Sequence, residues 1–257
     1  MLTRILALSL ALLATSLPAQ AGRLVDLEIF SRSTGETLSP YRHSGQTYVA
    51  GNPGERYGVR LVNRTGQRVL VVLSVDGVNA VSGETAAPDQ SGYVLGPWER
   101  SEVTGWRKSL REVAQFYFTA LPDSYAARSG RPDDVGVIGA AVFRENVRRL
   151  PEPVMPYLGN SAAGEVAATS ADRAAPASPA AKAMRESERL GTGHGQREYA
   201  PTQYTEFERA GVSPAEVVAV RYDSRDNLLA RGVIPAPRPY WPEPRPFPGR
   251  FVPDPRG

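Results

Sequence analysis

His194 lies in the segment whose residue types best suit acid–base chemistry or the binding of an anion. Glycines alternate over residues 191–195, and glycine allows neighbouring backbone N–H groups to converge on an anion. The dinucleotide-binding pattern G-x-G-x-x-G fails at Gln196, so a flexible hinge or a tight turn is the simpler interpretation. The weak candidates for ligand binding are Gly193, His194, Arg197 and Trp106.

A hydrolase would need a base with a partner, and the sequence offers only weak candidates. The nucleophile pattern G-x-S-x-G does not occur. His194 is the least implausible base, with Asp223 or Glu208 as its partner. A spatial triad of His194 with Ser224 and Asp223 or Asp226 is open in principle, because triads need no sequence motif. The sequence therefore favours a protein that is not an enzyme, without deciding the point.

No metal site and no cofactor are expected. The chain has no cysteine and only two histidines, of which His43 is expected in a surface turn, whereas zinc and copper sites usually combine several such ligands. Residues 223–227 lack the D-x-D-x-D-G spacing of a calcium loop and are expected to form an exposed turn. Two acid pairs have the composition that glycosidase chemistry needs but no distinguishing context: Asp133 with Asp134, and Glu206 with Glu208.

The charge balance does not point to nucleic acid. The formal net charge is +3, which is too small to predict such a partner. Only Lys108 and Lys182 are lysines, so 28 of the 30 basic residues are arginine. A compositional bias is the simpler explanation, although arginine also suits the bidentate binding of carboxylate or phosphate.

Residues 1–21 have the pattern of a secretory signal peptide. Arg4 precedes an apolar run over residues 5–17, and Ala19 and Ala21 supply the small residues of a cleavage site. The apolar run is shorter than the roughly 20 residues that a membrane-spanning helix needs. We therefore expect cleavage after Ala21, no integral membrane span afterwards, and a periplasmic or secreted protein.

Residues 22–150 are expected to form an antiparallel β-sandwich of immunoglobulin-like or jelly-roll type. Val25, Leu27 and Ile29 alternate with acidic residues, which is the period of a strand with one buried face. Residues 69–75 read as a fully buried strand, and Asp76-Gly77 after it predicts a two-residue hairpin. Most aromatic residues here are expected in the core, with a platform for sugar or peptide as the alternative: Tyr93, Trp98, Trp106, Phe116, Tyr117 and Phe118.

The rest of the chain divides by composition. Residues 151–189 are rich in alanine and proline and are expected to form a flexible linker. Residues 190–234 are expected to form a small α+β block, with strands at 199–207 and 217–222, that docks on the first domain because it is too small to fold alone. Residues 235–257 form a tail with nine prolines among 23 residues, interleaved with aromatic residues and arginine.

Two stretches of the chain look familiar, one containing Val75-Asp76-Gly77-Val78-Asn79 and the other containing Leu190-Gly191-Thr192-Gly193-His194-Gly195. Both resemble a family of uncharacterised secreted proteins of proteobacteria. The resemblance covers the β domain and the second block, but not the leader, linker or tail. It implies an exported protein with a two-block layout and transfers no catalytic residue. The segments that carry it include Val75-Asp76-Gly77-Val78-Asn79, Gly105-Trp106-Arg107-Lys108-Ser109, Leu190-Gly191-Thr192-Gly193-His194-Gly195 and Thr205-Glu206-Phe207-Glu208-Arg209-Ala210.

The leading hypothesis is an exported, non-enzymatic binding or structural module of the bacterial envelope whose partner is an envelope protein or a glycan. The first alternative is an envelope hydrolase acting on glycan or peptide. The second is an accessory subunit that docks a larger machine through its Pro-rich tail.

Overall fold

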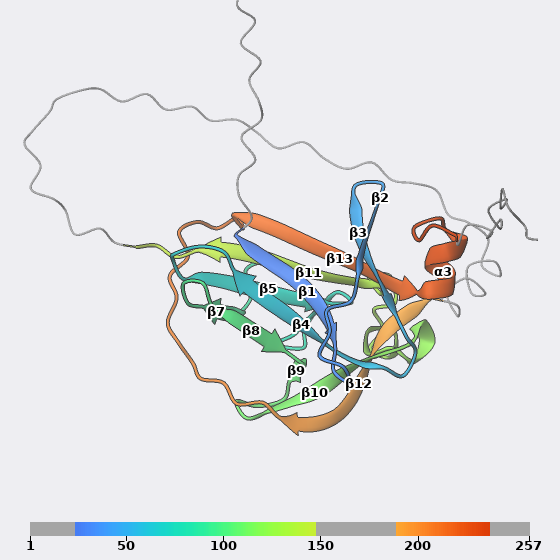
Figure 1. Ribbon diagram of the computed structural model, residues 1–257. Helices are drawn as coiled ribbons and strands as arrows, with labels where there is room; N and C mark the ends of the chain where they lie inside the picture. Colours follow the sequence, from blue (N-terminus) through green and yellow to red (C-terminus); the bar gives the residue numbers. More distant parts are fainter. Residues whose placement is uncertain (1–23, 148–188, 237–257) are drawn as a thin grey trace, which may run out of the picture.

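The computed structural model describes residues 24–147 and 189–236, which form two β-sheets packed face to face (Figure 1). This architecture confirms the prediction of a mainly β protein built as a sandwich. The expected signal peptide, the linker up to residue 188 and the tail from residue 237 lie outside the described residues.

The first sheet contains six strands: β1 (Val25–Ser31), β4 (Arg56–Asn63), β8 (Arg100–Val103), β9 (Gly105–Arg107), β10 (Glu112–Ala120) and β12 (Leu190–Tyr199). Its main order is β1-β4-β10-β12, with β8 also paired to β4 and β9 to β10. All these pairs are antiparallel.

The second sheet contains seven strands: β2 (Pro40–His43), β3 (Gln46–Gly51), β5 (Val69–Val75), β6 (Val78–Asn79), β7 (Tyr93–Leu95), β11 (Val137–Arg144) and β13 (Glu216–Ser224). Its order is β2-β3-β13-β11-β5-β6, with β7 also paired to β5. The β13–β3 pair is parallel, which the sequence did not predict. A parallel pair needs a long connection, and these two strands are far apart in the chain.

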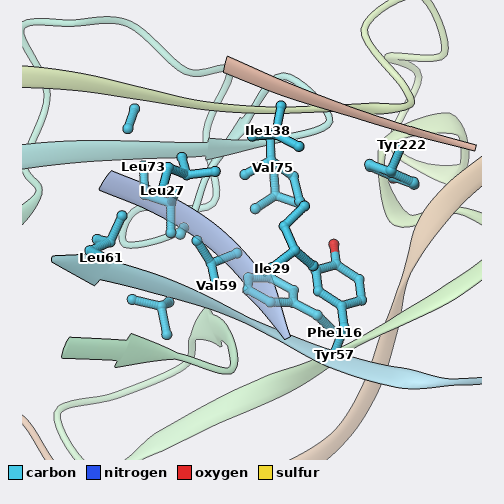
Figure 2. Packing of buried hydrophobic residues seen from close by; sticks show 14 of the residues in the cluster. Leu27, Ile29, Tyr57, Val59, Leu61, Leu73, Val75, Phe116, Ile138 and Tyr222 are labelled. Atoms are coloured by element: carbon cyan, nitrogen blue, oxygen red, sulfur yellow. The ribbon is translucent and has the colours of Figure 1, made fainter. Parts of the chain in front are cut away.

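Three short helices complete the described part: η1 (Leu121–Asp123), α1 (Tyr125–Arg128) and α3 (Arg225–Ala230). Side chains from both sheets meet in one core, as Figure 2 shows for Leu27 and Ile29 of β1 and Leu73 and Val75 of β5. Trp98 is an exception to the expected aromatic core, because it is 68% exposed.

The Asp76-Gly77 hairpin forms as predicted, between β5 and β6. Both residues have positive φ, 52° for Asp76 and 72° for Gly77, which is the conformation that a type I′ turn requires. At the start of β10, the Ser109 hydroxyl accepts hydrogen bonds from the amides of Arg111 and Glu112.

Residues 190–234 do not gather into a small block of their own. β12 extends the first sheet along β10, and β13 lies between β3 and β11 in the second sheet, so the two orange strands lie in different layers (Figure 1). The strand expected at 199–207 does not form. β12 ends at Tyr199, and residues 200–207 belong to no strand. The strand expected at 217–222 forms as part of β13, which begins at Glu216 and completes the second sheet.

The alternating glycines of residues 191–195 belong to β12 and form neither a hinge nor a turn. Tyr117 pairs with Gly193 across the two strands, and its ring occupies the place of the missing side chain. A Cβ on Gly193 would lie 2.1 Å from the ring carbon Cζ of Tyr117. Glycine is therefore required here because an aromatic ring lies on the strand.

We predict that Gly193→Ala lowers the free energy of unfolding by about 1–3 kcal/mol, because the new methyl group displaces the Tyr117 ring. Urea unfolding checks this, with Gly211→Ala as the control, since nothing lies within 4 Å of a Cβ at Gly211. In a Tyr117→Ala background most of the penalty should disappear. An equal penalty in both backgrounds would contradict the explanation.

Candidate functional site

A cleft lies at the end of the sandwich where β13 passes into α3, the end at which α3 is drawn in Figure 1. Its volume is about 510 Å³. We call it the arginine cleft, because its charged lining consists of three arginines and one aspartate. The full lining is Tyr48, Gly136, Arg189, Arg221, Tyr222, Asp223, Asn227, Ala230 and Arg231.

The turn from β13 into α3 fixes one wall of the arginine cleft. Ser224 is the N-cap of α3, and its hydroxyl accepts a hydrogen bond from the amide of Asn227. On its other side the helix buries Leu228 in a cluster with Tyr48, Val233 and Ile234. This packing holds α3 against β3, so Asn227 and Arg231 face the cleft at defined positions.

Asp223 is the acidic residue of the cleft and is almost fully buried. Its Oδ1 atom accepts hydrogen bonds from the amide of Ser224 at 2.8 Å, the side chain of Asn227 at 2.8 Å and the amide of Leu190 at 3.3 Å. Its Oδ2 atom lies 3.5 Å from Nη1 of Arg231. One carboxylate oxygen is thus committed to the fold, while the other keeps room for a further donor.

The three guanidinium groups differ in how many contacts they make within the chain. Arg231 is held by Asp223 and by Tyr48, whose ring centroid lies 5.3 Å from its Cζ. Arg189 donates through Nη2 to the carbonyl of Val135 at 2.6 Å. Within the described residues, the Arg221 side chain has no hydrogen bond or ion pair. A guanidinium group has five N–H donors, so this side of the cleft has donors and positive charge available.

A buried polar network lies beneath the floor of the cleft and connects the two sheets. Asp76, with no exposed surface, accepts hydrogen bonds from the amides of Thr192 at 2.7 Å and Gly136 at 2.9 Å and from the hydroxyl of Tyr222 at 2.7 Å. The Thr192 hydroxyl contacts the hydroxyls of Tyr222 at 2.7 Å and Tyr57 at 2.6 Å. One donor arrangement satisfies all three hydroxyls, with Tyr57 donating to Thr192, Thr192 to Tyr222, and Tyr222 to Asp76.

Burial shifts the acid–base properties of this network. It raises the pKa of Asp76, while hydrogen bonds from Tyr222, Thr192 and Gly136 oppose the rise. Burial and the nearby Asp76 carboxylate also raise the pKa of Tyr57 and of Tyr222. Shifted pKa values are typical of active sites, but a catalytic acid or base must come within hydrogen-bond reach of its substrate. Asp76 and Tyr57 are enclosed in the core, so their arrangement suits a structural role.

His194 lies on β12, away from the arginine cleft, in an aromatic and basic setting. Its ring is nearly parallel to that of Trp106, with centroids 6.2 Å apart, and lies 5.3 Å from that of Tyr125. Partial burial lowers the pKa of His194, and the positive charges of Lys108, Arg197 and Arg128 lower it further. A histidine with a lowered pKa is neutral at pH 7, so it adds no charge for an anion.

The structure does not bring His194, Asp223 and Glu208 together. Asp223 contacts Leu190, which is four residues from His194 along β12, or about 13 Å at the rise of a strand. Glu208 bonds to Asn146 just beyond the far end of β11, ten residues along the chain from Gly136 of the cleft, or roughly 30 Å at the same rise. Ser224, the nucleophile of the alternative triad, caps α3. The hydrolase hypothesis therefore gains no assembled site from these residues.

The remaining ligand-binding candidates are also separate from the arginine cleft. Trp106 is buried in the core and packs edge-on against Phe116. Arg197 is exposed and lies 3.4 Å from the carboxylate of Glu112. Gly193 accommodates Tyr117. Of the catalytic and ligand-binding candidates named from the sequence, only Asp223 lines the arginine cleft.

Sequence reasoning missed the arginines of the cleft. Arg189, Arg221 and Arg231 come from separate parts of the chain, and 28 of the 30 basic residues are arginine, so no local pattern distinguishes them. Asp76 was also missed as a buried acid, because Asp-Gly is already explained by the turn that it forms. No signal in a single sequence would have found either.

Comparisons with protein-family models, curated proteins and solved structures found no match to this chain. Function therefore has to be inferred from the geometry of the cleft.

We predict that stability depends on pH through Asp76. Because its folded pKa is raised, Asp76 stabilises the fold below the unfolded pKa of about 4, and this contribution is lost as the pH rises through the folded pKa. The unfolding free energy of the natural protein, measured relative to Asp76→Asn in urea, should therefore decrease as the pH rises from 4. A difference that is constant or grows with pH would contradict this. Exposed Asp89, changed to Asn, is the control.

Proposed function

We propose that this protein is an exported, non-enzymatic binding module of the bacterial envelope, and that its arginine cleft holds an anionic group of the ligand. The observation that carries the proposal is the set of three guanidinium groups and one carboxylate around a single cavity. The positive charges outnumber the negative one, so the cleft attracts an anion. Arginine also offers the paired donors that carboxylate and phosphate groups accept.

The distribution of titratable groups supports binding over catalysis. The acid with the raised pKa, Asp76, is enclosed beneath the cleft floor. Asp223 is held by backbone and side-chain donors of its own chain. Neither His194 nor Glu208 lies near it. The cleft therefore offers groups that can hold a ligand, and the Oδ1 atom of its one acid already serves the fold.

The leader pattern of residues 1–21 and the resemblance to secreted proteobacterial proteins support export to the periplasm or beyond. In residues 24–147 and 189–236, no helix is long and apolar enough to cross a membrane.

We predict that tricarballylate, which has three carboxylates and no hydroxyl group, binds the mature protein, and that Arg221→Gln weakens this binding about tenfold. A hydrogen bond to a charged group contributes roughly 1.5–3 kcal/mol, and 1.4 kcal/mol corresponds to about a tenfold change in affinity. Isothermal titration calorimetry measures the affinity of the natural protein and that of Arg221→Gln for tricarballylate. Rising salt should weaken binding, because Arg221 is exposed.

Arg100→Gln is the matched control, because it removes one exposed arginine of β8 that does not line the cleft. Equal losses in Arg100→Gln and Arg221→Gln would indicate a general effect of net charge and contradict a site at the cleft. No binding of tricarballylate by the natural protein would count against the proposed function itself.

A further inference from the structure

The size of the arginine cleft points to an organic ligand. Its volume of about 510 Å³ falls within the roughly 300–1,000 Å³ that is usual for sites of small organic molecules. Tyr48, Tyr222 and Ala230 are among the residues of its walls. A single inorganic anion would fill only a part of this space.

The cleft offers an acceptor as well as donors. Asp223 directs Oδ1 to three donors of its own chain, whereas in the described part of the chain Oδ2 has only the contact with Arg231 at 3.5 Å. For a ligand with anionic groups alone, the negative charge of this carboxylate offsets part of the attraction of the three arginines. A ligand that also carries hydroxyl groups can donate to Oδ2 while its carboxylate meets Arg221 or Arg189.

The strand edges beside the cleft argue against a peptide in extended form. Such a peptide would bind mainly through an open strand edge. At Arg221, β13 is paired with β3 on one side and β11 on the other. On β12, the amide of Leu190 donates to Asp223 and that of Thr192 to Asp76. The available groups are therefore those of side chains, which suit a ligand with polar groups around a ring.

We propose that the ligand of the arginine cleft is an acidic sugar, that is, a carboxylate on a polyhydroxylated ring. This inference rests on the proposed function and narrows it to one chemical class. Arg221 and Arg189 bind the carboxylate, and Oδ2 of Asp223 accepts from a ring hydroxyl. Asp223 thereby selects for hydroxylated anions over other anions of the same charge.

The test compares four probes by isothermal titration calorimetry on the full mature chain. They are trigalacturonate, the neutral galactotriose, tricarballylate, and the tripeptide Glu-Glu-Glu with a free carboxyl terminus. We expect trigalacturonate to bind at least tenfold more tightly than each of the others. Arg221→Gln should weaken the binding of trigalacturonate about tenfold, and Arg100→Gln should leave it unchanged.

Asp223→Asn tests the acceptor directly and keeps an oxygen for the donors that hold Oδ1. It should weaken the binding of trigalacturonate severalfold, because it removes an acceptor for hydroxyl groups. It should strengthen the binding of tricarballylate, because it removes a negative charge that repels carboxylates. If this variant does not fold, the comparison of probes on the natural protein and on Arg221→Gln still decides the question.

Each other outcome overturns the inference in a distinguishable way. Equal affinities for tricarballylate and trigalacturonate would show that the cleft binds anions but does not select for a sugar. Tighter binding of Glu-Glu-Glu would identify a peptide ligand. Tighter binding of galactotriose would show that the carboxylate is not recognised. Failure of all four probes would remove the proposed function together with the inference.

Discussion

The buried carboxylate of Asp76 is the constraint on which the rest of the structure depends. A buried polar group without partners costs free energy, and Asp76 has no exposed surface. Its donors come from Gly136 before β11, Thr192 of β12 and Tyr222 of β13. Because β12 and β13 belong to different sheets, satisfying this one carboxylate fixes how the two layers meet.

The same donors build the floor of the arginine cleft. Gly136 and Tyr222 both line it, and their polar groups point downward to Asp76. Asp223 then caps the amide of Leu190, much as Asp76 caps that of Thr192. Two aspartates thus block successive outward amides of an edge strand, which would otherwise be open to pairing with another chain. The polar groups that remain available in the cleft therefore belong to side chains.

The charged groups of the arginine cleft differ in how firmly the fold holds them. Arg231 is held by Asp223 and Tyr48, while Arg221 has no hydrogen bond or ion pair in the described part of the chain. A rigid acid–arginine pair beside a less constrained arginine can orient a ligand through one part and hold its charge through the other. This division suits the proposed ligand, which carries both an anionic group and hydroxyl groups.

The sequence by itself determined the features that follow from local patterns. These are the alternation of Val25, Leu27 and Ile29, the buried strand over residues 69–75 and the Asp76-Gly77 hairpin. Together such patterns were enough to predict a β-sandwich. Only the tertiary structure decided the position of β12 and β13 in opposite sheets, the burial of Asp76 and the meeting of Arg189, Arg221 and Arg231. Hydrophobic periodicity and turn chemistry act between near neighbours in the chain. The partners of a buried carboxylate come instead from distant positions, as Asp76 and Thr192 do, and the arginines of the cleft meet only because separate elements end at one place. Neither proximity has a signature in the order of residues.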